Sequence, residues 1–376
     1  MTFEKLTKAF VPIVILAIPP LIKTSLGPDE NNYLHYGEIF LSDGTYEFIK
    51  GHPFTAVLVA LINSILESPL RSYKLIYFCF SMLSYFGILA IVKELNRDQE
   101  IGLVSRLFIC LCPGTYFLGL YAITHVIYSG FLAFYILFLL RAVMYSNPRK
   151  INNFIIVGVL GALLYYTRLD GLITVLITIP AILILSLSKL IHVRITDVLA
   201  FIMVFAFLII PWHYYLMLTG YFISPIIFGG WQSNIWIDGP AKYLLGSTTQ
   251  LPLSDIDLVK HILLPLGKNT VLFSQYLGSV MLFPIYLWPL VGFGLSRFRQ
   301  FPQHLIIILV PFISCLPYII FYVEARYLIP ATLPLTILCL LGINKISKNV
   351  QSHFLPITSV SLLSFTNFVF AIGWIN

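Results

Sequence analysis

Residues 127–145 read IYSGFLAFYILFLLRAVMY, an apolar run with a single charged residue, Arg141. A helix needs about 20 mostly apolar residues to cross the hydrocarbon core of a bilayer. This run is long enough, and comparable runs recur along the whole chain. The stretch therefore predicts a membrane-spanning helix, and the number of similar runs decides the fold.

The composition of the whole chain is equally apolar. Of its 376 residues, 59% are hydrophobic and 10% are charged, whereas about 25% charged residues are usual in a soluble domain. A soluble fold of this length has no means of hiding so much apolar surface. The composition therefore predicts a polytopic membrane protein and excludes intrinsic disorder and a soluble enzyme. The formal charge is +7. In a membrane protein such an excess of Lys and Arg usually lies in the cytoplasmic loops, so it does not indicate nucleic-acid binding.

Eleven apolar runs are candidates for membrane spans, and a twelfth, 53–66, is short. If 53–66 does not cross, the clusters of Lys and Arg all fall on one side of the membrane, as the positive-inside rule requires. We therefore predict an all-α bundle of about eleven spans with the N-terminus inside and 53–66 as an interfacial or re-entrant segment. The expected spans are 9–26, 72–92, 103–121, 127–145, 152–167, 172–188, 197–217, 274–296, 304–322, 327–342 and 354–373.

Two long segments lie on the predicted outer side, within a single domain that covers 1–376. The first, 27–71, is expected to be catalytic, and it contains an amphipathic run, 31–41, suited to the membrane surface. The second, about 219–273, is expected to cover the donor or the acceptor. All other connections are short, and we find no internal repeat.

Charged residues gather on the outer side at positions where a charge is costly. Ionisable groups at such depth are usually paired or functional, although an ion pair can also simply close a short turn. The residues concerned are Asp29 and Glu30 after the first span, Arg168 and Asp170 between the fifth and sixth, and Glu324 and Arg326 between the ninth and tenth.

This distribution indicates group transfer from a lipid phosphate at the outer surface. A leaving phosphate needs positive charge, and the available cations are Arg168, Arg326 and His52. An acceptor hydroxyl must lose its proton as it attacks, and Asp29 or Glu30 is placed to take it. Such a site would work by positioning, general base action and charge stabilisation.

Several motifs occur in a fixed order along the chain: PDENNY at 28–33, DGTY at 43–46, GHPF at 51–54, CPG at 112–114, TRLDG at 167–171, PW at 211–212, GGWQSNIWI at 229–237 and ARYLIP at 325–330. Together they resemble the motifs of the GT-C glycosyltransferases, in particular family 39, which includes the protein O-mannosyltransferases and the lipid A aminoarabinose transferase. The resemblance implies an inverting sugar transfer from a polyprenyl-phosphate donor on the extracytoplasmic face of the plasma membrane. It leaves the acceptor open among a glycan, a lipid and a protein.

The resemblance also implies roles for individual residues. Asp29 matches the catalytic carboxylate, with Glu30 beside it. The donor phosphate is expected to contact Arg326, Arg168, His52 and Tyr327, and further substrate contacts are expected from His125, Asp170, Trp231 and Asn234.

His125 marks a departure from the family, which usually has an acid after the third span. A histidine can bind phosphate, bind a metal ion as neutral imidazole, or act as a base. No metal ligand set is predicted, because the five cysteines all fall inside apolar runs. A divalent cation is left open as a cofactor.

Two other functions fit parts of the pattern. A transporter or lipid flippase would explain the many spans, but transporters tend to show internal repeats and mid-span ionisable residues. A polysaccharide polymerase or ligase would use the same carboxylate and arginine chemistry.

Overall fold

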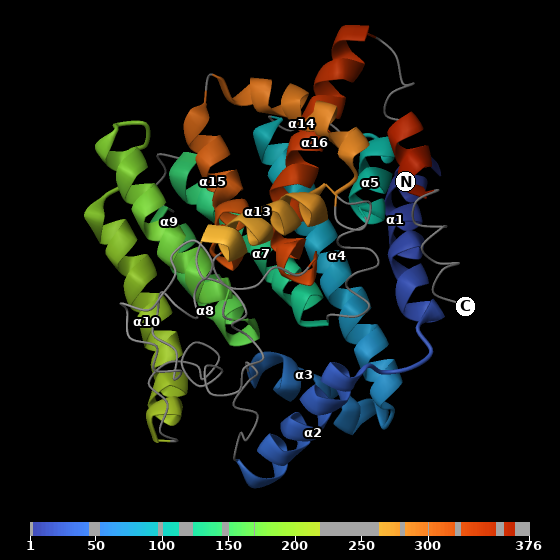
Figure 1. The fold of residues 1–376 in the computed structure, drawn as a ribbon, viewed down its shortest axis with the longest axis vertical. Coiled ribbons are helices and arrows are strands. Elements are labelled where there is room, and N and C mark those ends of the chain that lie inside the picture. Colours follow the sequence, from blue (N-terminus) through green and yellow to red (C-terminus); the bar gives the residue numbers. More distant parts are fainter. Residues whose placement is uncertain are drawn as a thin grey trace.

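The structure is a computed structural model, and it describes residues 3–44, 53–96, 101–112, 123–144, 150–168, 170–218, 263–278, 283–299, 301–319, 325–350 and 357–364. All regular structure in these ranges is helical. Seven of the helices in the described residues are long and apolar enough to cross a membrane. The chain is therefore a multi-pass helical bundle, as its composition predicts (Figure 1).

Most helices in the first part of the chain lie close to the expected runs, but inside the expected span 103–121 the helix ends at Leu111, because Cys112 has extended backbone and Pro113 follows it. The helices of this part are α1 (Phe3–Ile22), α2 (Pro28–Asp43), α3 (Pro53–Leu66), α4 (Pro69–Leu95), α5 (Leu103–Leu111), α7 (Ile123–Met144), α8 (Lys150–Thr167), α9 (Asp170–Leu187) and α10 (Ile195–Leu218). The later elements are shorter: α13 (Leu264–Leu277), η4 (Ile285–Leu287), α14 (Trp288–Leu295), η5 (Ser296–Arg299), α15 (Pro302–Ile313), η6 (Leu316–Ile319), η7 (Ala325–Leu328) and α16 (Ile329–Val350).

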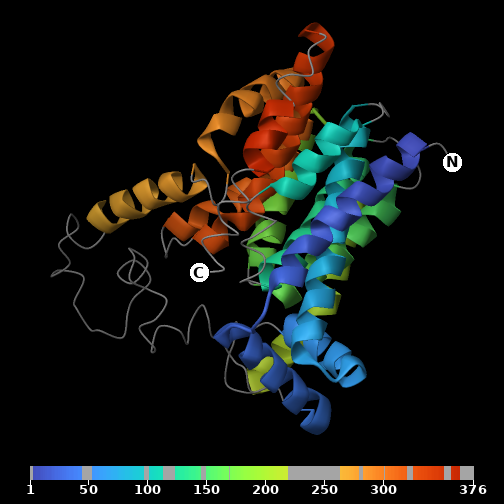
Figure 2. The same ribbon diagram turned by 90° about the vertical axis from the view of Figure 1, so that its right-hand side faces the viewer.

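The expected continuous span at 274–296 is wrong. Helix α13 ends at Leu277, with Gly278 as its C-cap, and the next helical element among the described residues is η4. Pro284 and Pro289 explain why the helix does not continue, because proline has no amide hydrogen to donate. In Figure 2, α13 projects from the side of the bundle instead of running along it.

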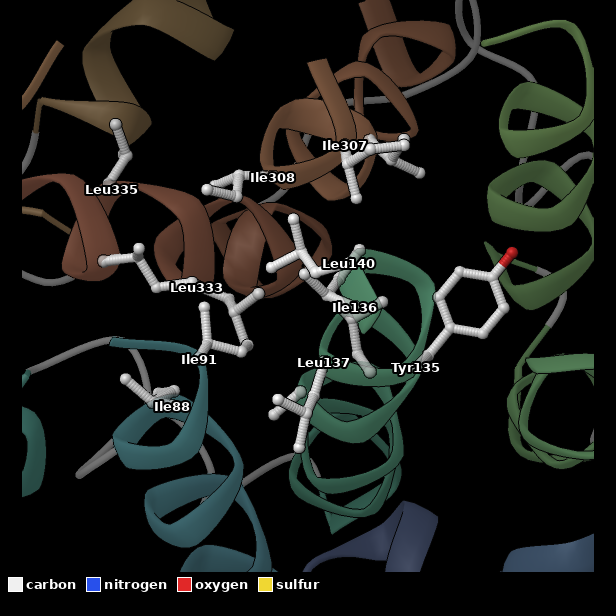
Figure 3. Packing of buried hydrophobic residues seen from close by; sticks show 14 of the residues in the cluster. Ile88, Ile91, Tyr135, Ile136, Leu137, Leu140, Ile307, Ile308, Leu333 and Leu335 are labelled. Carbon is white, nitrogen blue, oxygen red and sulfur yellow. The ribbon is translucent and has the colours of Figure 1, made fainter. Parts of the chain in front are cut away.

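Helices α7 and α16 form the centre of the bundle, and they are the most buried of the seven candidate spans. Figure 3 shows how Ile136 and Leu140 of α7 meet Ile91 of α4, Ile307 of α15 and Leu333 of α16. All five side chains are at most 3% exposed. This packing holds the four helices in fixed positions relative to one another.

Helix α10 lies at the edge of the bundle and has the opposite character. Leu199, Met203 and Phe207 are spaced four residues apart and are 49%, 66% and 74% exposed. Residues at that spacing share one face of a helix. This face of α10 is therefore suited to contact with lipid chains.

Two buried hydroxyl pairs link α7 to α9 inside the apolar bundle. Tyr128 Oη and Thr174 Oγ1 are 2.8 Å apart, and Tyr135 donates a hydrogen bond of 2.8 Å to Thr178. Polar groups that lack water must find partners in the protein. These pairs therefore favour one register between the two helices.

Helices α2 and α3 pack against each other at one end of the bundle (Figure 1). Lys74 in the first turns of α4 donates to the carbonyl of Leu21 near the end of α1, over 3.5 Å. The end of α1 thus lies beside the start of α4, and the chain forms α2 and α3 on its way from one to the other. With 14 residues, α3 is roughly 21 Å long, short of a hydrocarbon core of about 30 Å.

The basic clusters lie at the other end of the bundle. There Arg106 donates to the carbonyl of Lys8 over 3.3 Å, Arg141 pairs with Glu94, and Lys345 donates to Ser296 over 2.6 Å. We call this the basic end, where α7 ends and α8 begins. The opposite end, where α7 begins and α8 ends, is called the site end.

A close approach of α14 and α16 gives the first test of this packing. A Cβ atom at Gly294 would overlap the carbonyl of Leu338 on α16, whereas one at Gly292 would meet nothing within 4 Å. Gly294→Val should lower the free energy of unfolding by about 1–3 kcal/mol through overpacking. Gly292→Val is the control and should change it by less than about 0.5 kcal/mol. Thermal unfolding of the purified protein in detergent measures both, and equal effects would contradict this packing.

Candidate functional site

Four residues that the sequence singles out lie together at the site end. His125 comes from the first turn of α7, Arg168 and Asp170 from the connection between α8 and α9, and Tyr327 from η7. Ring and ion contacts join all four. Residues distant in sequence therefore form one cluster.

Arg168 is the hub of this cluster. Its Nε is 2.8 Å from Asp170 Oδ2, and one terminal nitrogen is 2.8 Å from His125 Nε2 and 3.4 Å from Thr124 Oγ1. The guanidinium carbon lies 5.6 Å from the centroid of the Tyr327 ring, within the range of a cation–π contact. The side chain is only 14% exposed, so these protein groups provide most of its surroundings.

Asp170 is bound from two sides. Oδ2 accepts the hydrogen bond from Arg168, and Oδ1 accepts one from the hydroxyl of Tyr318 in η6. The Tyr318 ring stacks on Tyr327, with centroids 5.0 Å apart and planes 11° from parallel. Arg168 and Asp170 thus form an ion pair, and the pair is part of a larger network.

The charge states of Arg168 and His125 follow from these contacts. Burial alone would lower the pKa of Arg168, but the Asp170 carboxylate and the Tyr318 hydroxyl raise that pKa above its ordinary value. Arg168 therefore stays charged and can only donate. His125 must accept with Nε2, which makes its ring neutral with the proton on Nδ1. His125 in this state orients Arg168.

The local sequence explains the sharp connection between α8 and α9. The Gly171 amide donates to the carbonyl of Arg168 over 3.0 Å. A Cβ atom at Gly171 would overlap the backbone of Leu164 and Tyr165. Asp170 stands in the first turn of α9, where the helix dipole favours a negative charge.

Asp29 and Glu30 begin α2 but have different environments. Glu30 is 3% exposed, and its two oxygens are 2.7 Å from Lys23 Nζ and 2.7 Å from the Gly27 amide nitrogen. Glu30 thus caps α2 and neutralises a buried lysine. Asp29 is exposed. Of the two candidate bases, Asp29 is the one that a substrate can reach.

Helix α2 and the Arg168 cluster share the site end. A small apolar cluster packs Val59 of α3, Tyr73 of α4 and Ile123 and Val126 of α7 against Tyr33 of α2. Ile123 and Val126 flank the two α7 residues that contact Arg168. The first turn of α7 therefore connects the α2–α3 segment to the cluster.

Some expected site residues cannot be compared with the structure. His52, Trp231 and Asn234 lie outside the described residues, as does the side chain of Arg326. The backbone of Arg326 belongs to η7 beside Tyr327. In the part of the chain that the structure describes, no three His, Cys, Asp or Glu side chains gather at a metal-binding distance.

Sequence reasoning missed Tyr318, Thr124 and Lys23. Tyr318 lies in an apolar run, where a tyrosine resembles an ordinary packing residue. Thr124 adjoins His125 but carries no charge. A lysine after a first span reads as a solvated helix end, yet Lys23 pairs with Glu30. Nothing in the sequence identifies these partners.

Several solved structures resemble this chain. ArnT from Cupriavidus metallidurans bound to undecaprenyl phosphate superposes with a TM-score of 0.58 and 14% identity, covering 91% of this chain and 60% of that one. The Archaeoglobus fulgidus oligosaccharyltransferase with Zn and sulfate gives 0.61 and 14%, covering 96% and 50%. AglB from Archaeoglobus fulgidus, with an inhibitory peptide and a dolichol-phosphate, gives 0.58 and 12%, covering 97% and 55%.

These matches share the GT-C architecture. The chain has the GT-C fold. It spans half to three fifths of the length of these solved structures. No protein-family model matches the chain, and no curated protein matches it. The resemblance in the sequence therefore predicted the GT-C fold correctly.

The hydrogen bond from Tyr318 to Asp170 can be tested separately from the stacking of Tyr318 on Tyr327. Tyr318→Phe keeps the ring on Tyr327 but removes the hydrogen bond to Asp170, and should cost about 1.5–3 kcal/mol of unfolding free energy. Tyr318→Leu should cost about 0.5–1.5 kcal/mol more, because the aromatic pair is lost. Thermal unfolding in detergent measures both. Tyr214→Phe, at a position 62% exposed on α10, is the control, and an equal loss there would refute the bond.

Proposed function

We propose that this chain is a membrane glycosyltransferase that moves a sugar from a polyprenyl-phosphate donor to an acceptor hydroxyl, with inversion, on the extracytoplasmic face. The observation that carries the proposal is the cluster around Arg168, which lies at the same end of the bundle as Asp29. The GT-C fold supports it, and so do the lipid phosphates named with ArnT and AglB. The acceptor class stays open.

In the proposed reaction, Asp29 removes the proton from the acceptor hydroxyl as its oxygen attacks the anomeric carbon. The bond between that carbon and the phosphate oxygen breaks, and the lipid phosphate leaves with the bonding electrons. Attack from the face opposite the phosphate inverts the anomeric centre. Asp29 is suited to this role because it is exposed on α2, whereas both oxygens of Glu30 are occupied.

The leaving phosphate requires positive charge. Asp170 compensates the charge of Arg168, so we assign the main phosphate contact to Arg326, with His52 as a second donor. In this proposal Arg168 holds the ring of Tyr327, the residue that follows Arg326 in the sequence, and its positive charge adds to the stabilisation of the leaving phosphate. His125 and Asp170 orient Arg168, and Trp231 and Asn234 remain candidates for substrate contact.

Asp29→Asn tests the proposed base. The variant should transfer sugar about 10²–10⁴ times more slowly, the usual contribution of general base catalysis. The measurement incubates purified protein with a panel of synthetic polyprenyl-phosphate sugars and follows release of lipid phosphate. If Asp29→Asn keeps the wild-type rate, Asp29 is not the base. If the wild type releases no lipid phosphate from any donor, the proposed function is wrong.

Two variants on the same helix serve as controls. Asp43 is exposed at the far end of α2, so Asp43→Asn should keep the wild-type rate. Glu30→Gln should lower the thermal midpoint, because Lys23 loses a buried partner. If Asp29→Asn also lowers the midpoint, its loss of activity reflects folding.

A further inference from the structure

A cavity of about 350 Å³ opens at the basic end of the bundle. Its walls come from the ends of α4 and α7, from the connection that follows α9 and from the starts of α8 and α15, with η5 on one side. None of the residues in the Arg168 cluster lines it. The cavity is therefore separate from the proposed transferase site.

The helices fix the separation of the two places. His125 begins α7 in the cluster, and Val143 near the end of α7 lines the cavity. Eighteen residues of helix correspond to about 27 Å, close to the thickness of a hydrocarbon core. The cavity and the cluster thus lie at opposite faces of the membrane.

Two cations, Lys150 and Arg297, line the cavity together with the imidazoles of His192 and His304. Among the described residues that line it, Glu94 is the one acid. Arg141, which does not line the cavity, already pairs with Glu94. The carboxylate of Glu94 is therefore already neutralised, and an anion that enters the cavity meets a net positive charge.

Arg297 is the main cation that faces the cavity. It is exposed, and among the described residues it has no carboxylate partner and no hydrogen bond. Lys150 differs, because its ammonium donates to the carbonyl of His192. Gln303 adds an amide that can donate to a ligand oxygen. A guanidinium and an amide on one wall suit the oxygens of a phosphate.

The other part of the lining is apolar. Leu190, Phe298 and Phe301 line the cavity beside the cations, and Phe301 stacks on His304 with ring centroids 5.4 Å apart. Basic residues of an ordinary solvated loop would not be expected beside apolar side chains that line the same cavity. The combination fits a phosphate that carries an organic group.

We propose that this cavity binds a phosphate-bearing anion, held by Arg297 with Lys150 and Gln303, at the membrane face opposite the transferase site. The source is either the headgroup of an anionic phospholipid or a soluble phosphate compound. Arg299 lies two residues further along η5, is exposed and does not line the cavity. It provides a matched control for the general attraction of basic loops to anions.

The experiment uses the full chain in nanodiscs and reads the thermal unfolding midpoint. One arm titrates inorganic pyrophosphate with phosphatidylcholine nanodiscs, and the other replaces part of the phosphatidylcholine by phosphatidylglycerol. We expect saturable stabilisation of the wild type in at least one arm. Stabilisation only by phosphatidylglycerol identifies the headgroup as the source, and stabilisation by pyrophosphate identifies a soluble phosphate.

Variants separate the cavity from general electrostatics. Arg297→Gln should weaken apparent affinity about tenfold or more, since it removes charge-assisted hydrogen bonds, and Lys150→Gln provides a second variant if the first fails to fold. Arg299→Gln should stay within about twofold of the wild type. No saturable stabilisation in either arm, or equal losses in Arg297→Gln and Arg299→Gln, would overturn the proposal.

Discussion

The ion pair of Arg168 and Asp170 is the constraint on which the candidate site depends. A buried pair is tolerated only when its other hydrogen-bonding positions are satisfied, because two charges have left water. Here His125, Tyr318 and Tyr327 surround the pair, and they come from α7, η6 and η7. The pair therefore draws elements far apart in sequence to one place. Moving His125 or Tyr318 leaves a hydrogen-bonding position of the pair unsatisfied.

The fold supplies the rigidity that this arrangement needs. Helices α7 and α16 are the most buried candidate spans, and α4 and α15 pack against them. The start of α7 carries His125, α16 continues directly from η7, and α15 leads into η6. Each polar group of the cluster thus stands at or near the end of a well-packed helix. Apolar packing in the membrane interior sets the positions of charges at its surface.

Sequence reasoning predicted the helices and part of the cluster. Apolar run length identifies spans without any knowledge of neighbours, and the TRLDG motif pointed to Arg168 and Asp170. The hydrogen-bonding partners of these two residues were harder to predict. The apolar run that contains Tyr318 indicates a helix, but it does not indicate which other helix that tyrosine faces. Asp29 and Glu30 are adjacent and chemically alike, and only the path of the chain from Lys23 to Gly27 buries one of them. The break after Leu277 was missed because run length outweighed the prolines.

The two ends of the bundle differ in how their charges are balanced. At the site end, Arg168 and Lys23 each have a carboxylate partner. At the basic end, only some of the cations are compensated, as in the pair of Arg141 and Glu94. The positive-inside rule then predicts that the basic end faces the cytoplasm. The predicted orientation does not depend on whether α3 crosses the membrane, because α7 runs from His125 at the site end to Arg141 at the basic end. A compensated, aromatic cluster at the site end and an uncompensated cationic cavity at the basic end follow from the same distribution of charge.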